Sequence, residues 1–263
     1  MNNILFFLVI ILFQLQNIDA STIKINDINN ALNKSEISKL TLIMNKEINF
    51  HKQHMTLPHK ITYNLRICNK NQLKKYKKLQ SNLYLGIFNY ATNEAIIKKG
   101  SHFFRTTVHE SNHYIMRLGF KNPPNWIDEG LAEYFETAYI SNGDVFVRIH
   151  ADNRKRLQNW YKNGEIPPLA SVLSWSSVFW RHLDSKASRD FKSRKIAWGL
   201  IYFLMNSKEN RQSLHKIIKV LKNNHNKNIV MIIQSNYIGG FSKFQKDFFS
   251  FLQKMPNKQK LLF

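Results

Sequence analysis

Two histidines and a glutamate, His109, Glu110 and His113, have the residue types and the spacing that suit metal-assisted hydrolysis. Residues 108–113 read V-H-E-S-N-H, which contains H-E-x-x-H. In a helix, side chains four residues apart lie on one face, so the two imidazoles can share one zinc ion with Zn–N bonds of about 2.0–2.1 Å. Glu110 lies beside the first ligand and can accept a proton from a water molecule on the same metal. The motif therefore predicts attack of a zinc-activated water on an amide.

A later glutamate can complete the ligand set. A catalytic zinc site has three protein ligands and one open position, and two histidines with one glutamate are a known combination. Glu129 lies within N-W-I-D-E-G-L-A-E-Y-F, residues 125–135, and residues 119–124 read G-F-K-N-P-P. Glycine suits the end of one helix and proline the start of the next. The sequence therefore predicts a helix, a short loop and a second helix that returns Glu129 to the metal.

The two segments together resemble the gluzincins, which are zinc peptidases, and most closely the peptidase MA-like group of secreted domains. The resemblance rests on H-E-x-x-H followed by W-[IL]-x-E-G-[LF]-A-E-Y. It implies that His109, His113 and Glu129 bind zinc and that Glu110 is the general base. It further implies that Glu133, one helical turn after the ligand glutamate, supports the first histidine by a hydrogen bond.

The choice of the third ligand has an alternative. Fifteen residues separate His113 from Glu129, and nineteen separate it from Glu133. The gap in the well-known gluzincins is usually longer than the first of these. Trp126 and Gly130 flank Glu129 as the motif requires, and a loop tolerates a change of length. We therefore expect Glu129 to be the ligand, with Glu133 as the alternative.

The surrounding pattern predicts an α+β fold. Residues 61–67 alternate apolar and polar side chains, residues 82–98 read as strand, turn and strand, and a helix begins at about His102. Much of the C-terminal half has helical periodicity, with apolar stripes at 214–221 and 241–251 that we expect in the core. The resemblance implies a zincin-like catalytic domain, in which an exposed strand of a small N-terminal sheet could align a peptide substrate.

These expectations divide the chain into four parts. Residues 1–20 are a signal peptide and residues 21–60 a prosegment or an extra lobe. Residues 61–145 form the zincin-like catalytic lobe, and residues 146–263 form a mostly helical C-terminal lobe.

The N-terminus indicates export. Ile4 to Phe13 is an apolar run, and Ala20 offers a small residue for cleavage before Ser21. The run is short for a transmembrane span. A secreted or periplasmic protein is therefore expected, although the segment before the run carries no Lys or Arg. An uncleaved N-terminal membrane anchor is the alternative.

The charge balance is strongly basic, with 39 Lys and Arg against 17 Asp and Glu and a net charge of +22. Such a field attracts polyanions and anionic envelope surfaces, and the alternative is that the Lys and Asn richness reflects only an AT-rich genome. The basic residues are spread along the chain, and no specific nucleic-acid motif is present. We expect a protein or peptide substrate and a monomer.

Other potentially reactive residues carry less information. Cys68 is the only cysteine, which excludes an intrachain disulfide. His51, His54 and His59 could form a metal group, but isolated surface histidines are commoner. Several histidines and tyrosines could stabilise the oxyanion of an attacked amide, as a guanidinium group could, and the sequence marks none of them.

The expected function is therefore that of a secreted zinc metallopeptidase. One alternative is a zincin-fold protein that binds a polyanion or another protein without proteolysis. A second is a zinc hydrolase that acts on a bond other than a peptide bond.

Overall fold

The computed structural model describes residues 21–69, 71–73, 85–180, 191–224, 228–256 and 258–260. The signal peptide expected at residues 1–20 lies outside this part, as does most of the basic segment before residue 85. The described residues form an α+β fold in which a small sheet is followed by a mostly helical C-terminal part, as the sequence predicted.

The N-terminal sheet has four strands in the order β1-β2-β4-β3, and β3 alone is antiparallel to its neighbour. Apolar side chains such as Ile61, Tyr63 and Leu65 alternate with polar ones along β2, which buries one face. The two edge strands are β1 and β3. The strands are β1 (Thr22–Asp27), β2 (Lys60–Cys68), β3 (Gly86–Asn89) and β4 (Glu94–Lys98).

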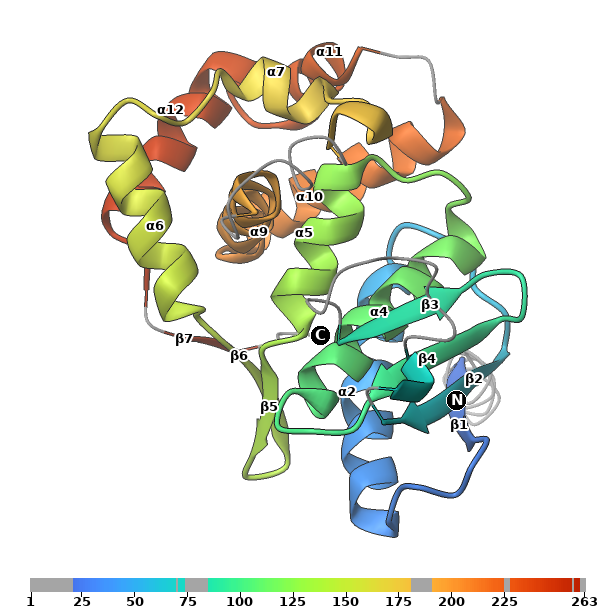
Figure 1. The fold of residues 1–263 in the computed structure, drawn as a ribbon. Coiled ribbons are helices and arrows are strands. Elements are labelled where there is room, and N and C mark those ends of the chain that lie inside the picture. Colours follow the sequence, from blue (N-terminus) through green and yellow to red (C-terminus); the bar gives the residue numbers. More distant parts are fainter. Residues whose placement is uncertain are drawn as a thin grey trace, which may run out of the picture.

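Two helices, α2 (Lys34–Lys52) and α4 (Phe103–Gly119), pack against each other behind this sheet in the view of Figure 1. A capping box fixes the start of α2, because Asn33 and Glu36 satisfy each other's backbone amides. The segment 21–60 thus supplies both an edge strand of the sheet and a helix that contacts α4.

The C-terminal part surrounds α9, whose residues from Ile196 to Met205 are all buried. Helix α5 packs more extensively on α9 than on any other element, and the two run side by side in Figure 1. The helices of this part are α5 (Asn125–Phe135), α6 (Ala151–Lys162), α7 (Leu169–Ser174), α9 (Lys192–Met205), α10 (Lys208–Asn223), α11 (Ile229–Asn236) and α12 (Gly240–Gln253). A second sheet consists of β5 (Ala138–Ser141), β6 (Asp144–Arg148) and β7 (Lys258–Lys260), which pair antiparallel in the order β5-β6-β7.

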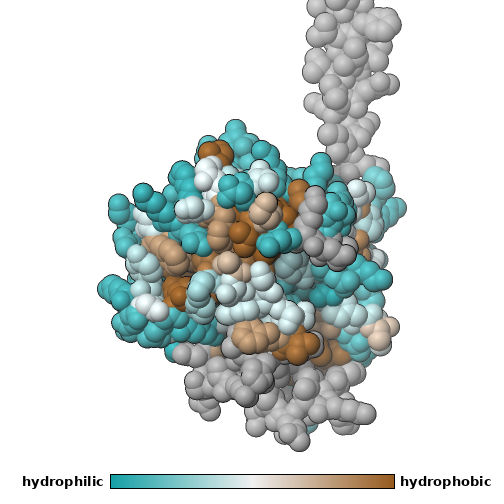
Figure 2. Space-filling view, turned by 90° about the horizontal axis from the view of Figure 1, so that it is seen from above, coloured by the Kyte–Doolittle hydropathy of each residue, from teal (hydrophilic) through white to brown (hydrophobic). Residues whose placement is uncertain are grey.

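One apolar cluster connects the N-terminal sheet to the C-terminal helices. The stripe expected at 214–221 is buried, and Phe244 and Phe248 of the second stripe are fully buried. Figure 2 views the molecule from the side that carries α7 and α11, where apolar and hydrophilic residues are interspersed. Within the described ranges, no helix combines the length and the apolar character needed to cross a lipid bilayer.

Candidate metal centre

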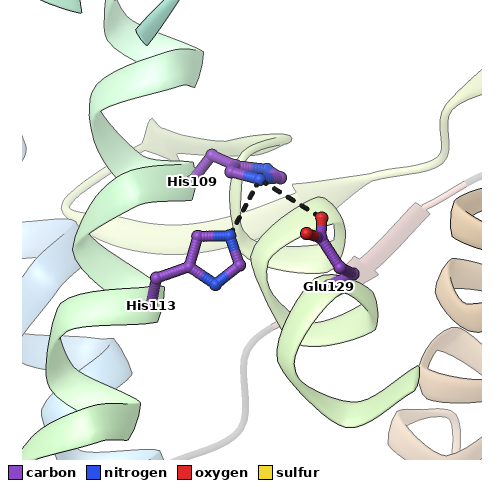
Figure 3. A group of neighbouring side chains, drawn as sticks. All are labelled: His109, His113 and Glu129. Atoms are coloured by element: carbon purple, nitrogen blue, oxygen red, sulfur yellow. Dashed lines mark hydrogen bonds and ion pairs between the residues drawn. The ribbon is translucent and has the colours of Figure 1, made fainter. Parts of the chain in front are cut away.

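Helix α4 brings His109 and His113 together, as their spacing predicts. Both side chains are buried, and their Nε2 atoms lie 3.2 Å apart. The two rings stand edge to face with centroids 4.9 Å apart, so both present Nε2 to one point (Figure 3). Tetrahedral coordination with bonds of about 2.0–2.1 Å separates two ligand atoms by about 3.3 Å. The observed separation therefore suits a shared metal ion.

Helix α5 supplies Glu129 to the same point. Its Oε2 atom lies 3.7 Å from Nε2 of His109, and the carboxylate faces both imidazoles (Figure 3). Gly130 allows this placement, because a Cβ atom there would lie 2.6 Å from Cγ1 of Ile201 and 2.7 Å from the carbonyl oxygen of Ala197. The glycine after the ligand glutamate thus lets α5 lie directly against α9.

These three side chains fit a metal ion. One ligand atom from each of His109, His113 and Glu129 lies within 4.8 Å of the other two. Oε2 of Glu129 is buried and accepts no hydrogen bond among the described residues, although Nη1 of Arg194 lies 3.4 Å from it, so its lone pairs are available to a metal ion. The donor set of two imidazoles and one carboxylate is the kind that holds a divalent transition metal.

Glu136 orients His109. Oε2 of Glu136 lies 3.0 Å from Nδ1 of His109, while its other oxygen is paired with Arg105. Burial alone would lower the pKa of His109, but the hydrogen bond to Glu136 and the nearby carboxylates raise it above its ordinary value. This contact leaves Nε2 as the nitrogen that faces the metal.

Asp128 orients His113, the second ligand histidine. Its Oδ1 lies 2.9 Å from Nδ1 of His113, and its Oδ2 accepts a hydrogen bond of 3.1 Å from Arg117. Burial opposes a charge on His113, but Asp128 and further carboxylates prevail and raise the pKa of this imidazole to about 10. Both ligand histidines are therefore held from behind by a carboxylate that is itself held by an arginine.

Glu133 does not make the hydrogen bond to His109 that was expected of it. The contact to Nδ1 of His109 comes from Glu136, and Oε2 of Glu133 instead lies 3.5 Å from Nδ2 of Asn153. The reason is geometric, because the residue two turns beyond Glu129 reaches back to the histidine ring and the residue one turn beyond it does not. Burial, followed by the neighbouring Glu136 carboxylate, raises the pKa of Glu133 to about 7.

Glu110 follows His109 on α4 and is half-buried. Strand β3 runs close to it, because a Cβ atom at Gly86 would lie 3.6 Å from Cγ of Glu110 and 2.5 Å from Cγ2 of Thr106. The Glu110 carboxylate is one of the charges that raise the pKa of His113. Glu110, the residue expected to act as the general base, therefore lies between the two histidines and the edge strand β3.

A third arginine, Arg194 of α9, approaches the ligand group itself. Its Nη1 lies 3.4 Å from Oε2 of Glu129. Burial raises the pKa of Glu129, but Arg194 and the two histidines outweigh it and lower that pKa. The sequence alone did not identify Arg194, Asp128 or Glu136 as neighbours of the ligands.

Arg105 and Arg117 could have been identified from their spacing. Together with His109 and His113 they recur every four residues and so share one face of α4.

The opposite side of α4 carries a buried polar layer. Ser111 donates a 2.6 Å hydrogen bond to Glu47 of α2, and burial raises the pKa of Glu47 well above its usual range. Asn112 contacts His51, and Nδ1 of His51 lies 3.2 Å from Nε2 of His54. His215 of α10 extends this line, with its Nδ1 2.8 Å from Nδ1 of His54.

The expectation of isolated surface histidines therefore fails for two of the three. His51 and His54 are buried, and only His59 is exposed. Hydrogen bonds connect these rings in a line, from His51 to His54 and from His54 to His215. Their nitrogen atoms do not converge on one point as metal ligands would.

Part of the chain that contains the candidate metal ligands is similar to a family of unknown function. Residues 103–226, less than half of the chain, match the family model described as "Protein of unknown function (DUF1570)". No curated protein was found to match the sequence. The matched segment begins at the first residue of α4 and contains His109, His113 and Glu129, so the chain is similar to this family in the region that holds the candidate metal ligands.

Proposed function

We propose that this protein is a secreted zinc metallopeptidase that hydrolyses peptide bonds with an activated water. The observation that carries the proposal is the convergence of His109, His113 and Glu129, with Glu110 next to the first ligand. Two imidazoles and one carboxylate leave a coordination position open for water and substrate. The gluzincin-like sequence pattern supports the same conclusion.

The residues have separate roles in this proposal. His109, His113 and Glu129 hold the zinc ion, and Glu136 and Asp128 fix the two rings so that Nε2 faces it. The bound zinc would polarise the scissile carbonyl group and make the attacking water more acidic. Glu110 takes the proton of that water as the oxygen attacks, and later gives it to the leaving amine.

The substrate would lie along strand β3. The edges of the N-terminal sheet are β1 and β3, and β3 is the edge that contacts α4. Its Gly86 lies against the helix beside Glu110. An extended peptide that pairs with this edge would place its carbonyl groups next to the general base. Export of the protein follows from the signal peptide proposed at residues 1–20, with an uncleaved anchor as the alternative.

The test uses mature protein without residues 1–20, as wild type and as Glu110→Gln. Mass spectrometry measures metal content, and fluorescein-labelled casein and a peptide mixture serve as substrates. We expect about one zinc ion per chain in both proteins, and a loss of about 10²–10⁴-fold in hydrolysis for Glu110→Gln. Glu209→Gln, at an exposed position in the first turn of α10, is the control and should retain full activity.

A non-proteolytic binding protein is the second candidate, and the net charge of +22 favours it. Such a protein would bind heparin or DNA with an affinity that falls steeply with salt and that Glu110→Gln leaves unchanged. Zinc binding without any hydrolysis, together with such binding, would support this candidate over the peptidase. Full hydrolysis by Glu110→Gln would remove Glu110 from its assigned role.

A further inference from the structure

Arg194 differs from the other two arginines of the metal centre. Arg105 and Arg117 each hydrogen-bond to a carboxylate that lies behind a ligand histidine. Arg194 comes from α9 and approaches the third ligand, Glu129, directly. Arg194 thus contributes a cation from the C-terminal helices to the ligand group.

The position of the guanidinium group is informative. Its Nη1 is 3.4 Å from Oε2 of Glu129, the same oxygen that lies 3.7 Å from Nε2 of His109. The Arg194–Glu129 contact is an ion pair by distance but lacks hydrogen-bond geometry, since Oε2 has no hydrogen-bond partner among the described residues. The side chain of Arg194 is 28 % exposed, so solvent and a substrate can reach it.

Two unfavourable local features occur next to Arg194, one of charge and one of backbone conformation. The first turn of α9 contains Lys192, Arg194 and Lys195 and no acidic residue, although the positive end of the helix dipole disfavours cations there. Phe191, just before this turn, has a φ of 40°, an uncommon conformation for a residue other than glycine. Its ring lies 5.7 Å from Cζ of Arg194. Strained backbone and unfavourable charge placement gather at functional sites.

We propose that Arg194 binds the carbonyl oxygen of the substrate as that oxygen gains negative charge, an inference that rests on the proposed peptidase function. When the water oxygen bonds to the carbonyl carbon, a water proton passes to Glu110. The electron pair of the C=O π bond then moves onto the carbonyl oxygen. A guanidinium group keeps its charge at every relevant pH and offers several N–H donors in one plane. Arg194 supplies those donors beside the ligand group.

The experiment separates anion binding from catalysis. Cobalt-loaded protein is titrated with inorganic phosphate, a tetrahedral anion, and the visible absorption bands of cobalt report binding at the metal. We compare wild type, Arg194→Ala and Arg194→Lys, with Arg148→Ala, at the exposed end of strand β6, as the matched control. The expected result is an unchanged cobalt content and a phosphate affinity weakened at least about tenfold in Arg194→Ala.

Hydrolysis of labelled casein by the zinc-loaded proteins gives a second measure. Loss of one oxyanion donor should lower kcat by about 10²–10³-fold. Arg194→Lys should lie between wild type and Arg194→Ala, and Arg148→Ala should match wild type. Arg194→Met keeps the apolar stem and replaces Arg194→Ala if that variant folds poorly.

Two results overturn the proposal. Loss of cobalt from Arg194→Ala or Arg194→Met would mean that Arg194 serves to hold Glu129. Unchanged phosphate affinity in a variant that keeps its metal would remove any contact between Arg194 and the bound anion. If wild type binds phosphate through Arg194 but the zinc-loaded protein cleaves no peptide, the peptidase function fails while the anion contact stands.

Discussion

Oε2 of Glu136 lies 3.0 Å from Nδ1 of His109, and this contact joins the end of α5 to the middle of α4. Asp128 makes the equivalent contact to His113 at 2.9 Å, near the start of α5. The two ligand histidines are thus fixed by two points of one helix. Contacts of this kind orient the ligand rings and favour metal binding.

Removal of either carboxylate should weaken metal binding while leaving the ligands intact. We expect Asp128→Asn and Glu136→Gln each to reduce zinc affinity by about 10–100-fold, because an amide is a weaker acceptor for Nδ1–H and leaves an arginine without its counter-charge. Competition with a chromophoric chelator measures the affinity. Glu209→Gln is the control, and wild-type affinity in both test variants would show that these contacts are dispensable.

Glu129 and Glu133 should behave differently when each is replaced by glutamine. Glu129 offers an oxygen within 4.8 Å of both ligand nitrogens, whereas Glu133 is placed beside Asn153. We expect Glu129→Gln to lose most of its zinc and Glu133→Gln to retain about one ion per chain. Mass spectrometry of the purified proteins decides, and the reverse pattern would identify Glu133 as the ligand.

The ligand group was predictable from sequence because it depends on local geometry. His109 and His113 needed only a helix, and Glu129 needed a turn, which the glycine and prolines of residues 119–124 predicted. The strands β2, β3 and β4 followed from alternation and turn residues. The histidine pair and the strands use neighbours within about one or two turns of chain, whereas the choice of Glu129 over Glu133 rested on the gluzincin-like motif around it.

The contacts behind the ligands were not predicted, for reasons that differ among residues. Arg105 and Arg117 share the helical face of the histidines, so periodicity could have marked them. Glu136 and Glu133 both lie on the face of Glu129, and only the angle between α4 and α5 decides which one reaches His109. Arg194 comes from a helix 65 residues after Glu129, and tertiary packing alone brings it to the site.

Gly130→Ala should destabilise the protein. The added methyl group would lie 2.7 Å from the carbonyl oxygen of Ala197, so α5 and α9 would have to separate. Overpacking of this kind costs about 1–3 kcal/mol, which lowers Tm by roughly 2–10 °C. Thermal unfolding in EDTA measures the packing effect without the metal. Gly100→Ala is the matched control, since a Cβ atom there meets nothing within 4 Å, and an equal Tm for both variants would contradict this account.

The buried histidines should make the protein sensitive to mild acid. Burial lowers the pKa of His51 to about 4 and that of His215 to about 4, and it also lowers the pKa of His54, with Arg211 and Lys222 nearby adding to the effect. An unfolded histidine has a pKa of about 6.5, so the unfolded state binds protons that the folded state does not. The free energy of unfolding should therefore fall as pH decreases from about 6.5 to 4.

Urea unfolding of metal-free protein at several pH values tests this prediction. His215→Phe removes one of the buried histidines. Between pH 6.5 and 4 this variant should therefore lose less stability than wild type, by up to roughly 3 kcal/mol. The raised pKa values of Glu47 and Glu133 act in the opposite direction, because they remove stability as pH rises above 4.5, and both groups are common to the two proteins. Identical pH profiles would exclude the histidine line as the cause.

The parallel pairing of β1 with β2 limits how this protein can be regulated. Proteolysis near residue 60 would release β1 and α2 together, and with them Glu47 and His51 that contact the back of α4. It would also expose β2 as a new edge, which is a site for aggregation. We therefore expect residues 21–60 to remain part of the folded protein after export, as an extra lobe and not as a prosegment.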